Sequence, residues 1–192
     1  MQTLIIITGT SGAGKTLQLE MLEQHYGQGR VLTIATRPQR IDKADDAYHF
    51  VSDKQLTEME SRGETIWVIG RYGSRYSITE QAIWEPIQNN KGIAFVAITP
   101  DYHVFLADWC KRNGVTPINA HLVAPHPDEQ KRRLLQRDGE KFDPKRIQAS
   151  AEFEADAREA ATKTELHFIE QVGPQKMSMQ LRGLIDSKHV PS

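Results

Sequence analysis

The chain has 192 residues, a formal net charge of −1 and a sequence pI of about 6.7. This length suits one well-packed domain, and the balanced charge excludes a global basic field, so nucleic acid is not indicated as a partner. Cys110 is the only cysteine, which excludes an intrachain disulfide, and no apolar run is long enough to span a bilayer. We therefore expect a cytoplasmic protein with no membrane partner.

Strand and helix patterns alternate along the chain, and this alternation predicts an α/β fold with a mostly parallel sheet and helices on both faces. The first elements are a strand over residues 3–8, a helix over residues 15–26 and a strand over residues 31–35. Later elements continue the alternation, with strands over residues 92–99, 119–124 and 166–170 and helices over residues 102–113, 128–137, 145–163 and 177–185.

The regular alternation of strand and helix patterns is interrupted over residues 36–88, and this change predicts a small lobe inserted into the main sheet. Short strand-like pieces occur around residues 48–51 and 65–71. Between them Ser52 begins a helix, and Gln55 stands where a capping box requires glutamine or glutamate.

The run from Gly9 to Thr16 is the most informative motif, because a glycine-rich loop ending in Gly-Lys-Thr follows a buried strand and opens a helix. Such a phosphate-binding loop (P-loop) curls so that successive N–H groups point at phosphate oxygens. Lys15 reaches the β- and γ-phosphates, and the Thr16 hydroxyl is a ligand for Mg²⁺. The motif predicts a nucleoside triphosphate site built from Gly9, Ser11, Gly12, Ala13, Gly14, Lys15 and Thr16.

Other segments resemble the guanylate kinases, in the family's order: residues 36–40, residues 48–52, the region 70–78 with Tyr76, and the basic stretch 133–146. The resemblance implies a P-loop kinase with a five-stranded parallel core at residues 1–35, 89–136 and 148–192. It places an acceptor-binding lobe at residues 36–88 and a mobile lid at residues 137–147. The implied reaction transfers the γ-phosphoryl group of ATP, with Mg²⁺, to the phosphate of an acceptor nucleotide.

The lobe carries residues suited to holding the acceptor's phosphate. Arg37 and Arg40 lie three positions apart beside a proline and present two guanidinium forks to one phosphate. Tyr48 and Tyr76 add phenolic donors to the same cage, although packing within the lobe explains them equally well. A phosphate acceptor needs such a cage, because its negative charge repels the γ-phosphate that must approach it.

The predicted lid is flanked by arginines that the resemblance places in catalysis, together with Lys15. Arg133 and Arg137 are four positions apart and share one face of a helix. The resemblance implies that they contact ATP and steady the migrating phosphoryl group, and that Arg146 comes from the far side of the lid. A closing lid of this kind supplies positive charge and excludes water.

The residues that read guanine in this family are altered here. Trp67 stands in the place of a glutamate that accepts hydrogen bonds from guanine, and Ile78 stands in the place of a serine. Thr33 keeps a hydroxyl where the family has a base-reading serine, and Thr99 replaces an acidic residue. Loss of a buried acceptor lowers discrimination for guanine, so we expect a base other than guanine, such as a modified or pyrimidine one.

Three functions follow from these observations. We prefer an ATP-dependent kinase whose partner is a small phosphorylated acceptor, a nucleoside monophosphate. The first alternative is a sugar-phosphate kinase like the ribose bisphosphate phosphokinases, which lack the guanine reader. The second is a non-catalytic guanylate kinase-like binding module, and it ranks lower because Lys15 is retained. A P-loop kinase acting on a group of nucleic acid stays open, and the protein is expected to be a monomer or a homodimer.

Overall fold

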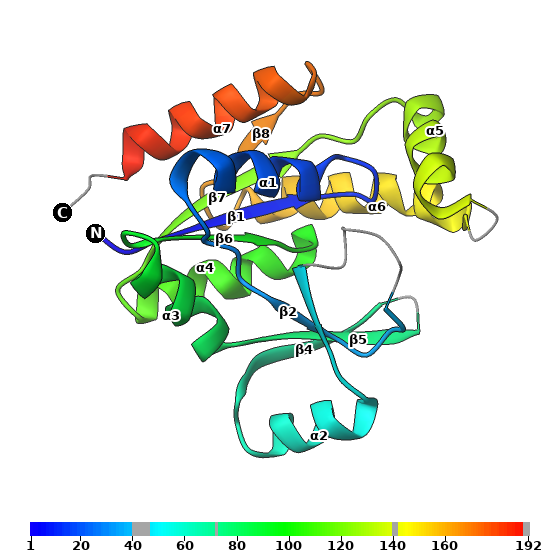
Figure 1. Ribbon diagram of the computed structural model, residues 1–192. Helices are drawn as coiled ribbons and strands as arrows, with labels where there is room; N and C mark the ends of the chain where they lie inside the picture. The colour runs from blue at the N-terminus through cyan, green and yellow to red at the C-terminus, as the bar shows by residue number, and fades with distance from the viewer. Residues whose placement is uncertain (40–46, 72, 140–141, 190–192) are drawn as a thin grey trace.

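The computed structural model describes residues 1–39, 47–71, 73–139 and 142–189. Its core is a parallel sheet in the order β6-β1-β7-β8 (Figure 1). These strands are β1 (Thr3–Gly9), β6 (Ile93–Ala97), β7 (Thr116–Leu122) and β8 (His167–Ile169). The α/β fold predicted from the alternation is therefore confirmed.

Helices cover both faces of this sheet, as the apolar pattern of β1 requires. Ile5 and Ile7 pack with α1 (Lys15–Tyr26) and α7 (Pro174–Lys188), whereas Leu4 and Ile6 point to the opposite face. That face is covered by α3 (Glu80–Asn89) and α4 (His103–Arg112). Because successive strand residues point to opposite faces, a run of four apolar residues is what a strand buried on both sides requires.

The parallel sheet has four strands among the described residues, not the five that the resemblance implied. The missing edge strand is reduced to one bridge between Arg30 and Phe95. Phe95 N donates to Gly29 O (2.7 Å), and Val31 N donates to Phe95 O (2.8 Å). The chain then leaves the core, so the strand expected over residues 31–35 becomes β2 (Thr33–Ala35) of a second sheet.

The second sheet has the order β3-β2-β5-β4 and forms the inserted lobe (Figure 1). Its other strands are β3 (Tyr48–Phe50), β4 (Thr65–Arg71) and β5 (Ser74–Thr79). The helix α2 (Asp53–Ser61) begins with the predicted capping box, in which the Ser52 side chain bonds Gln55 N and the Gln55 side chain bonds Ser52 N. We refer to β2–β5 with α2 as the lobe.

The remaining elements connect the core to the predicted lid. A short 3₁₀ helix (Pro100–Tyr102) leads into α4. The helices α5 (Pro127–Asp138) and α6 (Lys145–Ala160) flank the lid residues. Within the described part of the chain, no helix is long and apolar enough to cross a membrane.

Candidate active site

One cavity of about 680 Å³ brings together three parts of the chain that are distant in sequence. Its walls come from the loop after β1, from the lobe, and from the helices that flank the lid. The predicted site residues that line it are Ser11, Gly12, Ala13, Gly14, Lys15, Thr16, Thr33, Arg37, Tyr48, Trp67, Tyr76, Ile78, Thr99, Arg133, Arg137 and Arg146. Gly9 is not a lining residue, and Arg40 lies outside the described residues.

Glycine is required at three positions of the loop between β1 and α1. The backbone φ is +144° at Gly9, +83° at Gly12 and +98° at Gly14, a region that residues with side chains rarely adopt. A Cβ atom on Gly9 would also lie 2.8 Å from the carbonyl oxygen of Leu122 on β7. Such conformations are what the curled backbone of a P-loop requires.

Lys15 folds back onto its own loop. Its ammonium nitrogen donates to the carbonyl oxygens of Gly9 (2.6 Å) and Thr10 (2.9 Å). Burial, and secondarily the charge of Arg137, lower the pKa of Lys15 to about 8. A positive charge is thus held inside the loop, where the β- and γ-phosphates of a bound triphosphate would lie.

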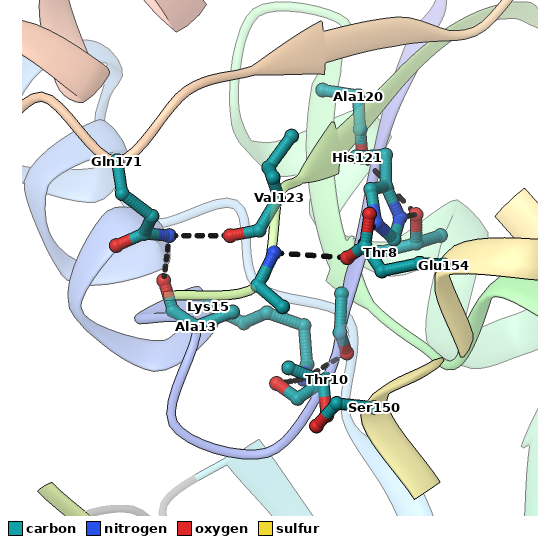
Figure 2. A network of polar contacts seen from close by, with 12 residues as sticks. Thr8, Thr10, Ala13, Lys15, Ala120, His121, Val123, Ser150, Glu154 and Gln171 are labelled. Carbon is teal, nitrogen blue, oxygen red and sulfur yellow. Dashed lines mark hydrogen bonds and ion pairs between the residues drawn. The ribbon is translucent and has the colours of Figure 1, made fainter. Parts of the chain in front are cut away.

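Two buried polar networks, missed by sequence reasoning, support the loop (Figure 2). On one side the Thr10 hydroxyl lies 2.9 Å from Ser150 Oγ of α6, and Gln130 Nε2 of α5 lies 2.7 Å from the same Ser150 oxygen. On the other side His121 bridges Thr8 Oγ1 (2.9 Å) and Glu154 Oε1 (3.0 Å). The partners of each network are 20 to 140 positions apart, so no local pattern signals them.

The lobe places an arginine and two tyrosines on the cavity wall. The Arg37 guanidinium carbon lies 4.7 Å from the ring centre of Tyr48 and 5.0 Å from that of Phe50, in cation–π geometry. Tyr48 and Tyr76 meet edge to face with ring centres 6.3 Å apart. The aromatic rings hold the guanidinium in place at the cavity.

Part of the cavity wall that the lobe contributes is apolar. Trp67 and Ile78 are register partners across β4 and β5, and both line the cavity. The Thr99 hydroxyl nearby is buried and has no hydrogen-bond partner in the described structure. The acidic residues nearest to Trp67 and Ile78 in sequence have partners of their own, since Glu64 pairs with Arg62 and Glu80 accepts a hydrogen bond from Trp109 Nε1 (3.0 Å).

Carboxylates orient the arginines of the flanking helices. Arg133 donates to Glu129 Oε1 (2.7 Å), and its Nη1 reaches Gly12 O of the loop (3.0 Å). Hydrogen bonds from Arg132 and Arg133 lower the pKa of Glu129 to about 2. Arg137 and Arg146 share a different carboxylate, that of Asp138, which is 8% exposed.

Comparison with known proteins places these features in a family. The family model described as guanylate kinase matches residues 1–168. The solved guanylate kinase from Anaplasma phagocytophilum superposes with a TM-score of 0.70 at 15% sequence identity, over 97% of this chain and 86% of that one. No curated protein matches the chain in sequence. The match over residues 1–168 spans most of the core, the lobe and the lid, and this chain belongs to the guanylate kinase family.

Proposed function

We propose that this protein transfers the γ-phosphoryl group of ATP to the phosphate of a nucleoside monophosphate whose base is not guanine. The observation that carries the proposal is the single cavity shared by the P-loop, the lobe residues Arg37, Tyr48 and Tyr76, and the arginines beside the lid. A cavity of about 680 Å³ falls within the range of small-molecule sites. In this proposal the cavity holds donor and acceptor phosphates facing each other.

The chain's own residues supply most of the charge that this reaction requires. Lys15 and the loop amides hold the β- and γ-phosphates, while Arg37 and Arg40 hold the acceptor's phosphate. Arg133, Arg137 and Arg146 offset the charge that spreads over the transferred group in the transition state. No general base is needed, because a phosphate monoester is already ionised at neutral pH.

A magnesium ion fits this donor set. Thr16 lines the cavity beside Lys15, and the described residues contain no cluster of three or more histidine, cysteine or acidic side chains that could hold a metal on its own. Mg²⁺ in kinases is held largely by substrate phosphates and water, with few protein oxygens, and the P-loop hydroxyl is one of these. Thr16 would hold the ion, which supplies charge neutralisation between the phosphates.

The proposed base preference rests on the apolar wall formed by Trp67 and Ile78. Guanine carries N–H donors on its edge, and burying them against apolar groups without acceptors costs about 1–3 kcal/mol for each. The acidic residues nearest in sequence, Glu64 and Glu80, are held by Arg62 and Trp109. The catalytic reading ranks above a binding module because Lys15 and the arginines beside the lid are all on the cavity wall.

A panel assay tests the proposal directly. ATP-to-ADP conversion is measured with each ribo- and deoxyribonucleoside monophosphate and with ribose phosphates as acceptors. We expect turnover with a nucleoside monophosphate other than GMP. Strong preference for GMP would contradict the base assignment, turnover with ribose phosphates alone would establish the sugar-phosphate alternative, and no turnover with any acceptor would contradict the kinase assignment.

A further inference from the structure

Three consecutive carbonyl groups of the P-loop are held by side chains from outside the motif. Ser11 O accepts from Gln130 Nε2 (2.8 Å), Gly12 O from Arg133 Nη1 (3.0 Å), and Ala13 O from Gln171 Nε2 (3.2 Å). These donors lie at least 119 positions further along the chain. The outward side of the loop is therefore fixed by α5 and by the segment after β8.

Fixing a carbonyl also fixes the amide that follows it. In a trans peptide the C=O and N–H bonds point in opposite directions. The bond from Gln130 to Ser11 O turns the N–H of Gly12 away from Gln130, and the bond from Gln171 to Ala13 O turns the N–H of Gly14 away from Gln171. The intervening Ala13 N–H closes a turn to Thr10 O at 3.3 Å. Gly12 and Gly14 are the two loop residues with left-handed φ that line the cavity.

Gln130 is buried and fully engaged beside the loop. Its side chain is 1% exposed, and its Nε2 also lies 3.3 Å from Thr10 Oγ1 and 2.7 Å from Ser150 Oγ. Only the amide nitrogen can donate to Ser11 O, so this contact sets which way the amide faces. Gln130 is buried between the loop and α6, so the Ser11 carbonyl points into the protein and the Gly12 N–H points away from it.

Both the nitrogen and the oxygen of the Gln171 side-chain amide are hydrogen-bonded close to the loop (Figure 2). Its Nε2 bridges Ala13 O and Val123 O, the latter at 2.7 Å, while its Oε1 accepts from Arg133 Nη1 at 3.1 Å. One side chain thus connects the loop, the end of β7 and a predicted catalytic arginine. Loss of its donor would release the Ala13–Gly14 peptide, and loss of the whole amide would also remove one contact of Arg133.

We infer that Gln130 and Gln171 are positioning residues of the triphosphate site, which turn the amides of Gly12 and Gly14 toward the phosphates. The inference rests on the proposed function, since it presupposes a triphosphate in the loop. Neither glutamine contacts the reacting atoms in this scheme. Each acts through a backbone N–H whose orientation it determines.

The experiment measures binding of ATP with Mg²⁺, and of inorganic triphosphate, by calorimetry. Gln171→Leu and Gln130→Leu each remove the donor, and Gln171→Met and Gln130→Met remove it while keeping the side chain's length and neutral charge. We expect each variant to bind both probes at least ~10-fold more weakly, because a misdirected amide loses a charge-assisted hydrogen bond. The acceptor KM should stay within twofold. Gln136→Leu, an exposed glutamine on the same α5, is the matched control and should bind like the parent.

The outcomes separate the two proposals. Failure of the parent protein to bind either probe would overturn the proposed function. Parent binding with folded Leu and Met variants that all bind within twofold would overturn the inference alone. A Met variant that keeps parent affinity would also overturn it, since packing rather than donation would then be the role. Should Gln130→Leu fail to fold by circular dichroism, the Gln171 variants decide, because that side chain is only partly buried.

Discussion

Trp67 on β4 and Ile78 on β5 lie directly opposite each other in the hairpin of the lobe, and both line the cavity. Residues paired in this way share one face of a sheet, so the two side chains form a continuous apolar wall. Ile78 is 1% exposed and belongs to the same apolar cluster as Leu4 and Ile6 of the core strand β1. The surface proposed to recognise the base is therefore continuous with the core of the protein.

Replacing Trp67 by glutamate should shift acceptor preference toward guanine. A carboxylate at this position accepts hydrogen bonds from the guanine edge, and such a contact discriminates by a few kcal/mol. We expect the ratio of kcat/KM for GMP to that for the parent's best acceptor to rise at least ~10-fold. Trp67→Leu, which keeps the wall apolar, should leave that ratio within threefold. An unchanged ratio in Trp67→Glu would remove Trp67 from base recognition.

Arg37→Ala should weaken the acceptor site. The guanidinium is held over Tyr48 and Phe50 at the cavity wall, so its loss removes both charge and alignment. We expect the acceptor KM to rise at least ~10-fold and kcat to fall, while the ATP KM stays within twofold. Arg75→Ala is the control, because Arg75 bonds Glu60 and Thr57 on α2. Parent-like acceptor kinetics in Arg37→Ala would place the phosphate cage elsewhere.

Lys15→Met should abolish phosphoryl transfer and make the unliganded protein more stable. Below about pH 8 the ammonium is charged in both the folded and the unfolded states, and the folded state carries the cost of burying that charge. Between pH 8 and 10.5 the unfolded chain binds more protons at this group, so the parent should gain stability relative to Lys15→Met. Paired thermal melts from pH 7 to 10.5 measure this. A constant difference in Tm across that range would contradict the lowered pKa.

Affinity for ATP should fall as the pH rises above about 8. The lowered pKa of Lys15 means that the free protein loses this ammonium charge in that range, and binding must then restore the proton. The dissociation constant should increase toward tenfold per pH unit above 8. Calorimetry at pH 7, 8, 9 and 9.5 tests it, with Lys15→Arg, which stays charged, as the comparison. A flat profile in the parent would show that Lys15 does not titrate there.

Asp138→Asn should impair chemistry more than binding. The carboxylate accepts from Arg137 Nε (2.8 Å) and Nη2 (2.9 Å) and lies 3.5 Å from Arg146 Nη1. Its loss leaves two arginines without their shared anchor, so we expect kcat to fall at least ~10-fold with a smaller change in the KM values. Asp143→Asn, beside the first turn of α6, serves as the control. Steady-state kinetics measure kcat and the KM values. An unaffected kcat would show that Arg137 and Arg146 do not depend on the Asp138 carboxylate for their position.

Much of the core could be predicted because its signals are local. The buried strand, the glycine-rich loop and α1 follow one another within 26 residues, and α1 spans Lys15–Tyr26 as expected. The capping box at Ser52 is equally local and is confirmed. The strand predicted over residues 31–35 belongs to the sheet of the lobe and not to the core sheet, because its β character is visible in sequence while its pairing partner is set by tertiary contacts.

The supporting residues of the site were not predictable in the same way. Gln130 and Gln171 are ordinary glutamines in sequence, and only the fold shows that they meet loop carbonyls more than 100 positions away. Gln130 is a buried polar side chain on the charged helix α5, and Gln171 lies between β8 and α7, where no periodic pattern indicates its contacts. The roles of Arg37, Trp67 and the arginines beside the lid stay predictions, although the fold brings all of them to one cavity.

The chain enters the lobe once and leaves it once, and both crossings are very short. Val31 is still bonded to Phe95 of the core while Thr33 already begins β2, so Leu32 alone makes the first crossing. At the second, β5 ends at Thr79 and α3 starts at Glu80. Any swing of the lobe must therefore turn about these two points, so the gap between the proposed donor and acceptor sites depends on a handful of backbone torsions.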